Sequence, residues 1–195
     1  MTALELGESA ERFVVNLINI INKNRVIAEV INNKYDKLKN HEEGDINIKV
    51  SYDFKDISKL LADMNVDVKA SDKYDDPAIN IEYYDKETEK YVSSVKYLNA
   101  LTHDFYLAVG KYNKNEIDFS QKVKYALIKT KDFKNYLLTP DGKEISANCK
   151  KIKNPSYVSA GDWVKLSDFP NNLVFRSTDI YEVLRKMYKW KLNIK

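Results

Sequence analysis

The sequence contains one cysteine, Cys149, and two histidines, His41 and His103. A single cysteine excludes an internal disulfide bond and is typical of proteins that work in a reducing compartment. Two histidines and one cysteine are also too few for a zinc site of His and Cys ligands without help from carboxylates. We therefore expect a cytoplasmic protein that has no zinc centre of this kind.

Glycine and long apolar runs are scarce as well. The five glycines are isolated from one another, so the sequence has no glycine-rich phosphate loop of the kind that NTPases, kinases or dinucleotide-binding dehydrogenases use. No run of about 18 or more apolar residues occurs, and the first residues lack the basic and apolar regions of a signal peptide. We therefore expect no membrane-spanning segment and no membrane partner.

The 195 residues are 44% apolar and 31% charged, which is typical of a soluble globular domain with room for a small appendage. The charge is unevenly distributed. Residues 120–195 contain sixteen Lys or Arg and seven Asp or Glu, a balance of +9, although the whole chain carries only +3. The first 119 residues therefore carry −6. An acidic front and a basic back suit a metal-binding core followed by a segment that meets a polyanion, and a lysine-rich solubilising tail is the alternative.

Hydrophobic periodicity predicts alternating helices and strands in the first 110 residues. The expected elements are a helix at 7–22, strands at 25–31, 46–50 and 65–71, a connection at 52–64 that contains a short helix, an added strand at 78–84, a helix at 87–102 and a strand at 105–110. The remaining expected elements are strands at 122–129, at 135–138 and within 144–169, a turn at 140–142, and a helix at 179–189 capped by Ser177 or Thr178. This order predicts an α/β layer around a small mixed sheet.

Polar side chains on two of the predicted strands indicate a candidate site. Val66 and Val68 alternate with Asp67 and Lys69, so the carboxylate and the ammonium share the face opposite the valines. Asp45 opens the preceding strand, also on its polar face. Carboxylates bind hard divalent cations, and a neighbouring lysine can position or activate a water or neutralise charge on a phosphate. Asp-x-Lys alone is equally typical of a solvated ion pair on an edge strand.

The motifs Gly7-Glu-Ser-Ala-Glu11 on the first helix, Asp45 at the start of a strand and Asp67-Val-Lys69 on the next strand resemble those of the PD-(D/E)XK nuclease superfamily. The order of elements up to Gly110 is similar to the αβββαβ core of that superfamily, and Gly-x-x-x-Glu is similar to the first motif of archaeal Holliday junction resolvases. The resemblance implies an α/β, restriction-endonuclease-like core with a mixed central sheet in residues 1–119. Residues 120–195 would form a small basic α+β region packed on that core.

The resemblance also implies a role for each motif residue. Asp45 and Asp67 are the expected ligands of Mg²⁺, for which Mn²⁺ can substitute, and the backbone carbonyl of Val68 is the expected third ligand. Lys69 is the expected catalytic lysine, and Glu11 is an accessory acid. Mg²⁺ between two carboxylates supplies a hydroxide-like nucleophile and a sink for phosphate charge, which phosphodiester hydrolysis at neutral pH needs.

The sequence departs from the family pattern around Asp45. The 22 positions from Asp45 to Asp67 exceed what a simple hairpin needs, so we expect a helix between the two strands. His41-Glu-Glu-Gly44 precedes Asp45 where the family has a proline, and Glu43 is therefore an alternative ligand.

The function that these expectations favour is a Mg²⁺-dependent DNA endonuclease, most similar to type II restriction enzymes, because residues 120–195 are additional to the core. A Holliday junction resolvase or a recombination or repair nuclease of the same superfamily is the first alternative. A non-catalytic nucleic-acid-binding protein on the same fold is the second. By analogy with enzymes that cut duplexes through paired sites, we expect a homodimer.

The basic C-terminal region is expected to contact DNA phosphates through clustered lysines. The lysines chosen for this role are Lys122, Lys124, Lys150, Lys151 and Lys153. The alternative is that these lysines only keep a small β-rich appendage soluble.

Overall fold

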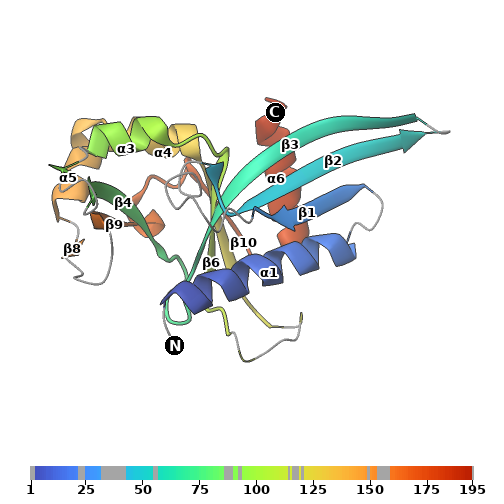
Figure 1. The fold of residues 1–195 in the computed structure, drawn as a ribbon, viewed down its shortest axis with the longest axis horizontal. Coiled ribbons are helices and arrows are strands. Elements are labelled where there is room, and N and C mark those ends of the chain that lie inside the picture. The colour runs from blue at the N-terminus through green and yellow to red at the C-terminus, as the bar shows by residue number, and fades with distance from the viewer. Residues whose placement is uncertain are drawn as a thin grey trace.

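Helix α1 (Ala3–Ile21) and the antiparallel strands β1 (Val26–Val30), β2 (Ile46–Phe54) and β3 (Ile57–Ala70) open the computed structural model of the chain (Figure 1). The structure describes residues 3–21, 25–31, 43–54, 57–85, 90–91, 94–113, 115, 119, 121–148, 150–152 and 159–194. Among these residues, none of the helices has the length and apolar character needed to cross a membrane.

The central sheet is mixed and has six strands in the order β1-β2-β3-β6-β7-β10. Helix α3 (Ser94–Ala100) precedes β6 (Phe105–Gly110), which pairs in parallel with β3. Strands β7 (Lys124–Lys129) and β10 (Val174–Ser177) continue the sheet by antiparallel pairing. The expected α/β class and mixed central sheet are therefore confirmed.

Alternation along β3 separates two cores. Ala62, Met64, Val66 and Val68 are buried in a cluster that includes residues of α1 and of α6 (Ile180–Lys191). The opposite face of the sheet packs in a second cluster with residues of α3 and of α4 (Thr130–Leu137). Asp67 and Lys69 belong to this second face because side chains alternate along a strand.

A second sheet of four strands adjoins the second core. Its order is β5 (Lys90–Tyr91), β4 (Ala78–Asp85), β9 (Ser159–Lys165) and β8 (Lys150–Ile152), all antiparallel. Figure 1 shows β4, β9 and helix α5 (Pro140–Asn148) at the end of the molecule opposite the β2–β3 hairpin. Ile79, Ile81 and Val164 join the second sheet to the core of the first.

The helix expected within residues 52–64 is wrong. The described parts of this segment end β2 and begin β3, which pair with each other from Ile46 and Val66 outward. Apolar residues near the turn do have helical spacing, but they do not share one buried face, since Leu60 is 54% exposed. Pairing with β2 therefore overrides the local pattern.

Two elements around β6 also differ from the expectation. The helix expected at 87–102 is shorter, because Lys90–Tyr91 form strand β5 and α3 begins only at Ser94; residues 86–89 and 92–93 lie outside the described part. The strand expected at 135–138 is the end of α4, whose buried residues Thr130, Phe133 and Leu137 are spaced by three and four.

The helix starts in the C-terminal region show similar differences. Pro140 begins α5 where a turn was expected, and proline is favoured at a first helical position because it needs no backbone N–H donor there. The cap of α6 is Asp179, whose carboxylate accepts a hydrogen bond of 2.8 Å from the backbone of Tyr181, and not Ser177 or Thr178.

The boundary expected between residues 119 and 120 falls between β6 and β7, which are hydrogen-bonded neighbours. Helix α6, near the end of the chain, packs in the same core cluster as α1. Residues 120–195 therefore extend the central sheet and contribute a helix to each of its faces.

Candidate active site

The two aspartates lie side by side because of the register of β2 and β3. Ile46 pairs with Val66, so Asp45, one residue earlier, lies beside Asp67 on the same face. The backbone N–H of Asp45 donates to the Val66 carbonyl over 2.9 Å. Gly44 makes this approach possible: it has a φ of +92°, and a Cβ there would lie 3.0 Å from the Val66 carbonyl group.

Strand β3 extends past Ile46, the first residue of β2, by several residues. Beyond Val66 the edge of β3 that faces β2 has no paired residue of β2, and the carboxylate of Asp45 instead accepts a hydrogen bond of 2.7 Å from the Val68 backbone N–H. The carbonyl of Val68 points to the same side as its N–H, since both groups of a strand residue face one neighbour. Among the described residues, the carboxylate of Asp45 and the carbonyl group of Val68 thus lie at the same edge of β3.

Lys69 lies between the two aspartates. Its Nζ contacts Oδ1 of Asp67 directly and is 3.9 Å from Oδ2 of Asp45. The side chain of Asp67 is 2% exposed, and that of Lys69 is 27% exposed. Burial lowers the pKa of the Lys69 ammonium, but the charges of Asp67 and Asp45 outweigh burial, so this pKa lies above its ordinary value. Lys69 is therefore a persistent cation in this arrangement.

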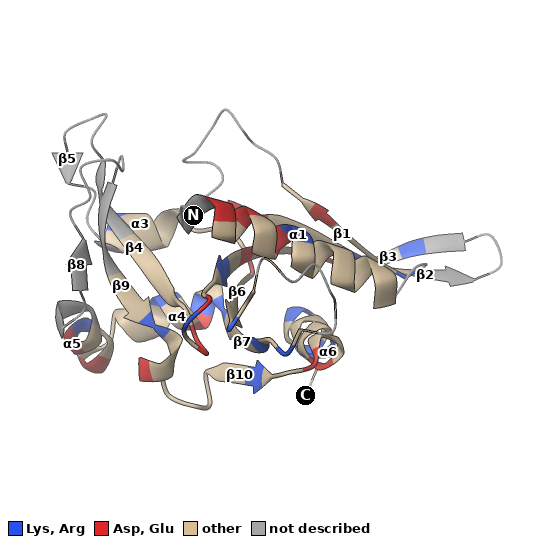
Figure 2. Ribbon diagram, turned by 90° about the horizontal axis from the view of Figure 1, so that it is seen from below, with Lys and Arg blue, Asp and Glu red and all other residues tan. Residues whose placement is uncertain are grey.

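Glu11 approaches the same group from α1. Burial, followed by repulsion from Asp45, raises the pKa of Glu11 to about 7. Burial and the charge of Asp67 likewise raise the pKa of Asp45 to about 6. Figure 2 shows acidic residues (red) in the N-terminal half of α1. Of the four catalytic residues expected from the sequence, Asp45, Asp67 and Lys69 lie within 3.9 Å of one another through the Lys69 ammonium, and their charges act on the pKa of the fourth, Glu11.

Two tyrosines beside this group were not expected from the sequence. Tyr106 pairs in register with Asp67 across the parallel strands, and it is completely buried. Burial, Tyr97 and Asp67 raise the pKa of the Tyr106 hydroxyl well above its ordinary value, so the hydroxyl stays protonated. Tyr97 of α3 donates a hydrogen bond of 3.2 Å to the carbonyl of Asn80. The one sequence signal for a role of Tyr106 is that it carries a polar hydroxyl group within the otherwise apolar segment 105–110.

The donors of this site suit a hard divalent cation. Asp45, Asp67 and the carbonyl of Val68 are oxygen ligands, which Mg²⁺ and Mn²⁺ prefer. In the part of the chain that the structure describes, no three His, Cys, Asp or Glu side chains form a ready-made cation site. The Lys69 ammonium compensates the charge of one aspartate and lies near both, so a cation bound between them requires Lys69 to turn away from at least one. Glu43, the alternative ligand, lies directly before Gly44 and is half-buried.

The lysines expected to contact DNA are only partly described. Lys124 is on β7 and pairs with Asp75 over 2.7 Å, and Lys122 is exposed just before β7. Lys150 and Lys151 belong to β8, but their side chains, like the whole of Lys153, lie outside the described part.

The arrangement can hold a cation on two carboxylates beside a permanent ammonium, and a group that titrates near neutral pH lies next to it. In comparisons with known proteins, no family model matches the sequence, and no curated protein or solved structure matches the chain.

Proposed function

We propose that the protein is a Mg²⁺-dependent DNA endonuclease of the PD-(D/E)XK type. The observation that carries the proposal is the convergence of Asp45, Asp67 and Lys69, with Glu11 next to them, where β2 begins and β3 continues past it. The chain order α1, β1, β2, β3, α3, β6, with β4 and β5 of the second sheet between β3 and α3, supports a restriction-endonuclease-like core, as does the parallel pairing of β3 and β6.

Each residue has a distinct task in this proposal. When bound by Asp45 and Asp67, Mg²⁺ supplies an activated water and positive charge for a phosphate oxygen. Lys69 remains protonated and acts as a fixed positive charge that stabilises the negative charge developing on the phosphate. Glu11, whose pKa is about 7, can hold or release a proton near neutral pH and acts as the accessory acid.

Among nucleases we favour a type II restriction-like enzyme, because residues 120–195 add two strands and a helix to the core sheet and so enlarge the surface available to a duplex. A Holliday junction resolvase or a recombination or repair nuclease would use the same four residues.

The second candidate function is a non-catalytic nucleic-acid-binding protein, and one observation favours it. Lys69 already contacts Asp67 and lies 3.9 Å from Asp45, so its single positive charge offsets one of the two carboxylate charges without a metal ion. An inactive member of a nuclease superfamily could keep such a group as a buried polar network.

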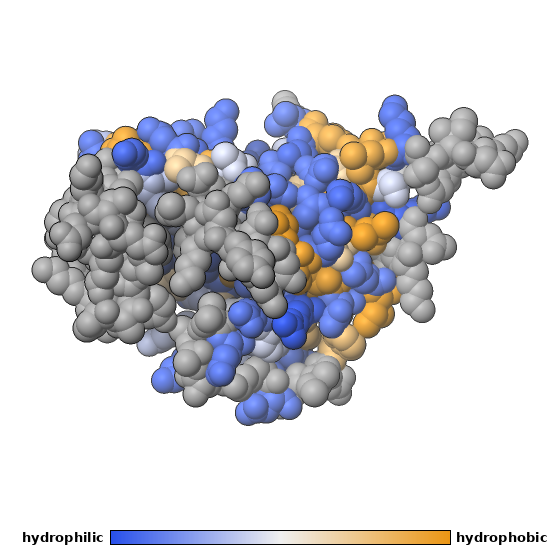
Figure 3. All heavy atoms as spheres, viewed as in Figure 1, coloured by the Kyte–Doolittle hydropathy of each residue, from blue (hydrophilic) through white to orange (hydrophobic). Residues whose placement is uncertain are grey.

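We also propose that the enzyme is a homodimer. Ile20, Ile21 and Ile27 are 50%, 38% and 57% exposed, and Figure 3 shows apolar side chains (orange) at the surface over α1 and β1. The side chain of Asn19 bonds both backbone groups of Ala28, which holds the two elements together. Sedimentation should give the mass of a dimer for the wild type and the mass of a monomer for Ile27→Lys. The same mass for both proteins would argue against this interface.

The decisive experiment is cleavage of a supercoiled plasmid. We expect nicked and linear products with Mg²⁺ or Mn²⁺ and no cleavage in EDTA. Binding without cleavage under all metal conditions would support the non-catalytic alternative. Cleavage that persists in EDTA would contradict the metal-dependent mechanism.

A further inference from the structure

The loop of residues 71–77 crosses the end of β6 and forms one wall of a hollow. A Cβ at Gly110 would lie 1.7 Å from the backbone carbonyl oxygen of Asp75, so this crossing requires a glycine in β6. A backbone hydrogen bond of 3.0 Å from Lys111 to Tyr74 fixes the loop beyond that point. The loop therefore has a defined position against the ends of β6 and β7.

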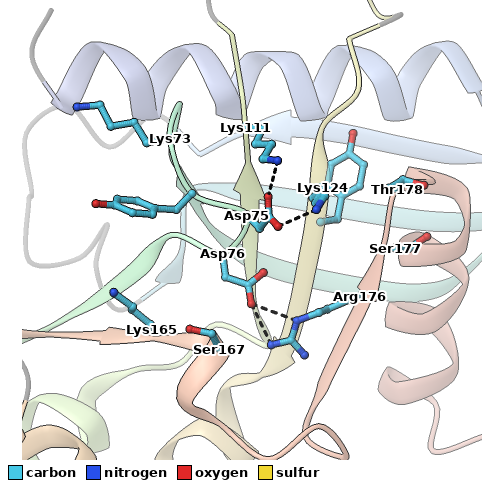
Figure 4. A pocket seen from close by; sticks show the side chains of 12 residues that line it. Lys73, Asp75, Asp76, Lys111, Lys124, Lys165, Ser167, Arg176, Ser177 and Thr178 are labelled. Carbon is cyan, nitrogen blue, oxygen red and sulfur yellow. Dashed lines mark hydrogen bonds and ion pairs between the residues drawn. The ribbon is translucent and has the colours of Figure 1, made fainter.

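The hollow has a volume of about 770 Å³ and a positive lining (Figure 4). Five cationic and two anionic side chains line it, which gives a formal charge of +3. We call this group the basic hollow, and its charged residues are Lys73, Lys111, Lys124, Lys165, Arg176, Asp75 and Asp76. Ser167 and Thr178 add exposed hydroxyl groups to the lining.

The carboxylates of the basic hollow neutralise part of its positive charge. Asp75 contacts Lys111 over 3.2 Å and Lys124 over 2.7 Å, and hydrogen bonds from Lys124 and Lys111 lower its pKa. These three side chains are about half exposed, so the pairs are weak and another anion can replace Asp75. Lys73 and Lys165 are exposed and have no ion pair with a carboxylate of the described residues.

The basic hollow lies on the same face of the sheet as the candidate active site. Lys69 pairs with Ala108 of β6, and Ala108 pairs with Ala126 of β7, which in turn pairs with Arg176 of β10. Directly paired residues share a face, so Lys69 and Arg176 point to the same side of the sheet. Lys124, two residues before Ala126, points to that side as well.

We propose that the basic hollow binds a backbone phosphate of a nucleic-acid strand, and that another phosphodiester of the same strand, a few nucleotides away, lies at the candidate active site. Lys73 is four residues from Lys69, which limits their Cα separation to about 14 Å. Phosphates of one duplex strand follow each other at about 3.4 Å along the axis, so this span is about four nucleotides. Lysine, arginine and hydroxyl groups are the usual ligands of such phosphates. The inference depends on the proposed function for the identity of its ligand.

The test is equilibrium binding of a fluorescent duplex oligonucleotide in EDTA, where no cleavage occurs. Lys73→Ala/Lys165→Ala should weaken binding and reduce the slope of log K against log salt by about two units, roughly one for each lost phosphate contact. Asp75→Asn should strengthen binding, because it frees Lys111 and Lys124 without changing the side-chain shape. The charge-matched control Lys131→Ala/Lys143→Ala, on exposed positions outside the hollow, should keep the wild-type slope.

An unchanged slope in Lys73→Ala/Lys165→Ala, or an equal loss in the control, would overturn the proposal. Two competitors identify the ligand class. Unlabelled duplex should displace the probe, and displacement at equal charge by polyglutamate or by inorganic phosphate alone would show a general anion site and would also overturn it. If the wild type binds duplex through the basic hollow but never cleaves it, the proposed nuclease activity is contradicted, and the binding of a nucleic-acid phosphate in the hollow is supported.

Discussion

At the scale of single residues, alternation along a strand was sufficient to group the candidate site. Val66 and Val68 are buried against α1 and α6, which leaves Asp67 and Lys69 on the opposite face, as predicted from their spacing alone. Tyr106 could not be predicted in the same way, because its place beside Asp67 depends on the register between two strands whose paired residues are 39 positions apart in the chain.

The raised pKa of Glu11 gives a pH-dependent stability. Below about pH 4.5 the carboxyl group is protonated in both the folded and the unfolded chain. As the pH rises to about 7, the unfolded chain ionises first, so the free energy of unfolding decreases through this window. In EDTA at pH 8, Glu11→Gln should therefore unfold with a free energy about 1–3 kcal/mol higher than the wild type.

Urea denaturation at pH 4.5 and pH 8 measures this difference. Glu8→Gln, an exposed acid on the same helix, is the matched control; its charge is the smallest named contribution to the raised pKa of Glu11, so it should change the stability at pH 8 far less than Glu11→Gln does. Equal stability of Glu11→Gln and the wild type at pH 8 would show that the Glu11 carboxyl is not buried against Asp45.

At the scale of elements, the sequence predicted those with clear periodicity and failed where spacing was ambiguous. The helix at 7–22 and the strand at 105–110 are present as α1 and β6. Apolar residues near the β2–β3 turn have helical spacing, but only pairing between distant residues shows that they belong to a hairpin. Residues 135–138 are too short a window to distinguish a strand from the last turn of α4.

Two glycines should respond oppositely to substitution by alanine. Gly7 lies in α1, and the nearest atom to its added Cβ, in the Glu11 side chain, is 4.0 Å away, so Gly7→Ala should stabilise the fold by about 0.5–1 kcal/mol. Gly110→Ala places a Cβ against the backbone of Asp75 and should destabilise the fold by about 1–3 kcal/mol or more. Thermal unfolding compares the two, and equal melting temperatures would mean that the 71–77 loop does not cross β6.

The start of α6 depends on one cap. Asp179→Ala removes the acceptor for the Tyr181 backbone N–H and should cost about 1 kcal/mol of unfolding free energy. The neighbouring exposed Thr178 makes a matched control, and Thr178→Ala should leave the stability within about 0.5 kcal/mol of the wild type. A larger loss of stability in Thr178→Ala than in Asp179→Ala would show that Asp179 is not the residue that caps α6.

At the scale of the whole molecule, the acidic and basic parts of the sequence form one sheet. All six residues of β6 are buried, and β7 covers one of its edges. We expect the full chain to unfold in a single transition and residues 1–119 alone not to fold, because β6 would lose its neighbour and the first core would lose α6. Circular dichroism during urea titration measures both, and cooperative unfolding of residues 1–119 would contradict this view.

The most direct test of the proposed chemistry compares two aspartates of β3. Asp67 and Asp63 face the same side of one strand, but Asp67 is buried and contacts Lys69, whereas Asp63 is exposed and accepts a hydrogen bond of 2.6 Å from Asn47. In single-turnover plasmid cleavage with Mg²⁺, Asp67→Asn should lose activity by at least about 10³-fold, since a cation ligand is lost, and Asp63→Asn should cleave like the wild type. Equal cleavage by Asp67→Asn and Asp63→Asn would contradict the assignment of this site as the catalytic centre.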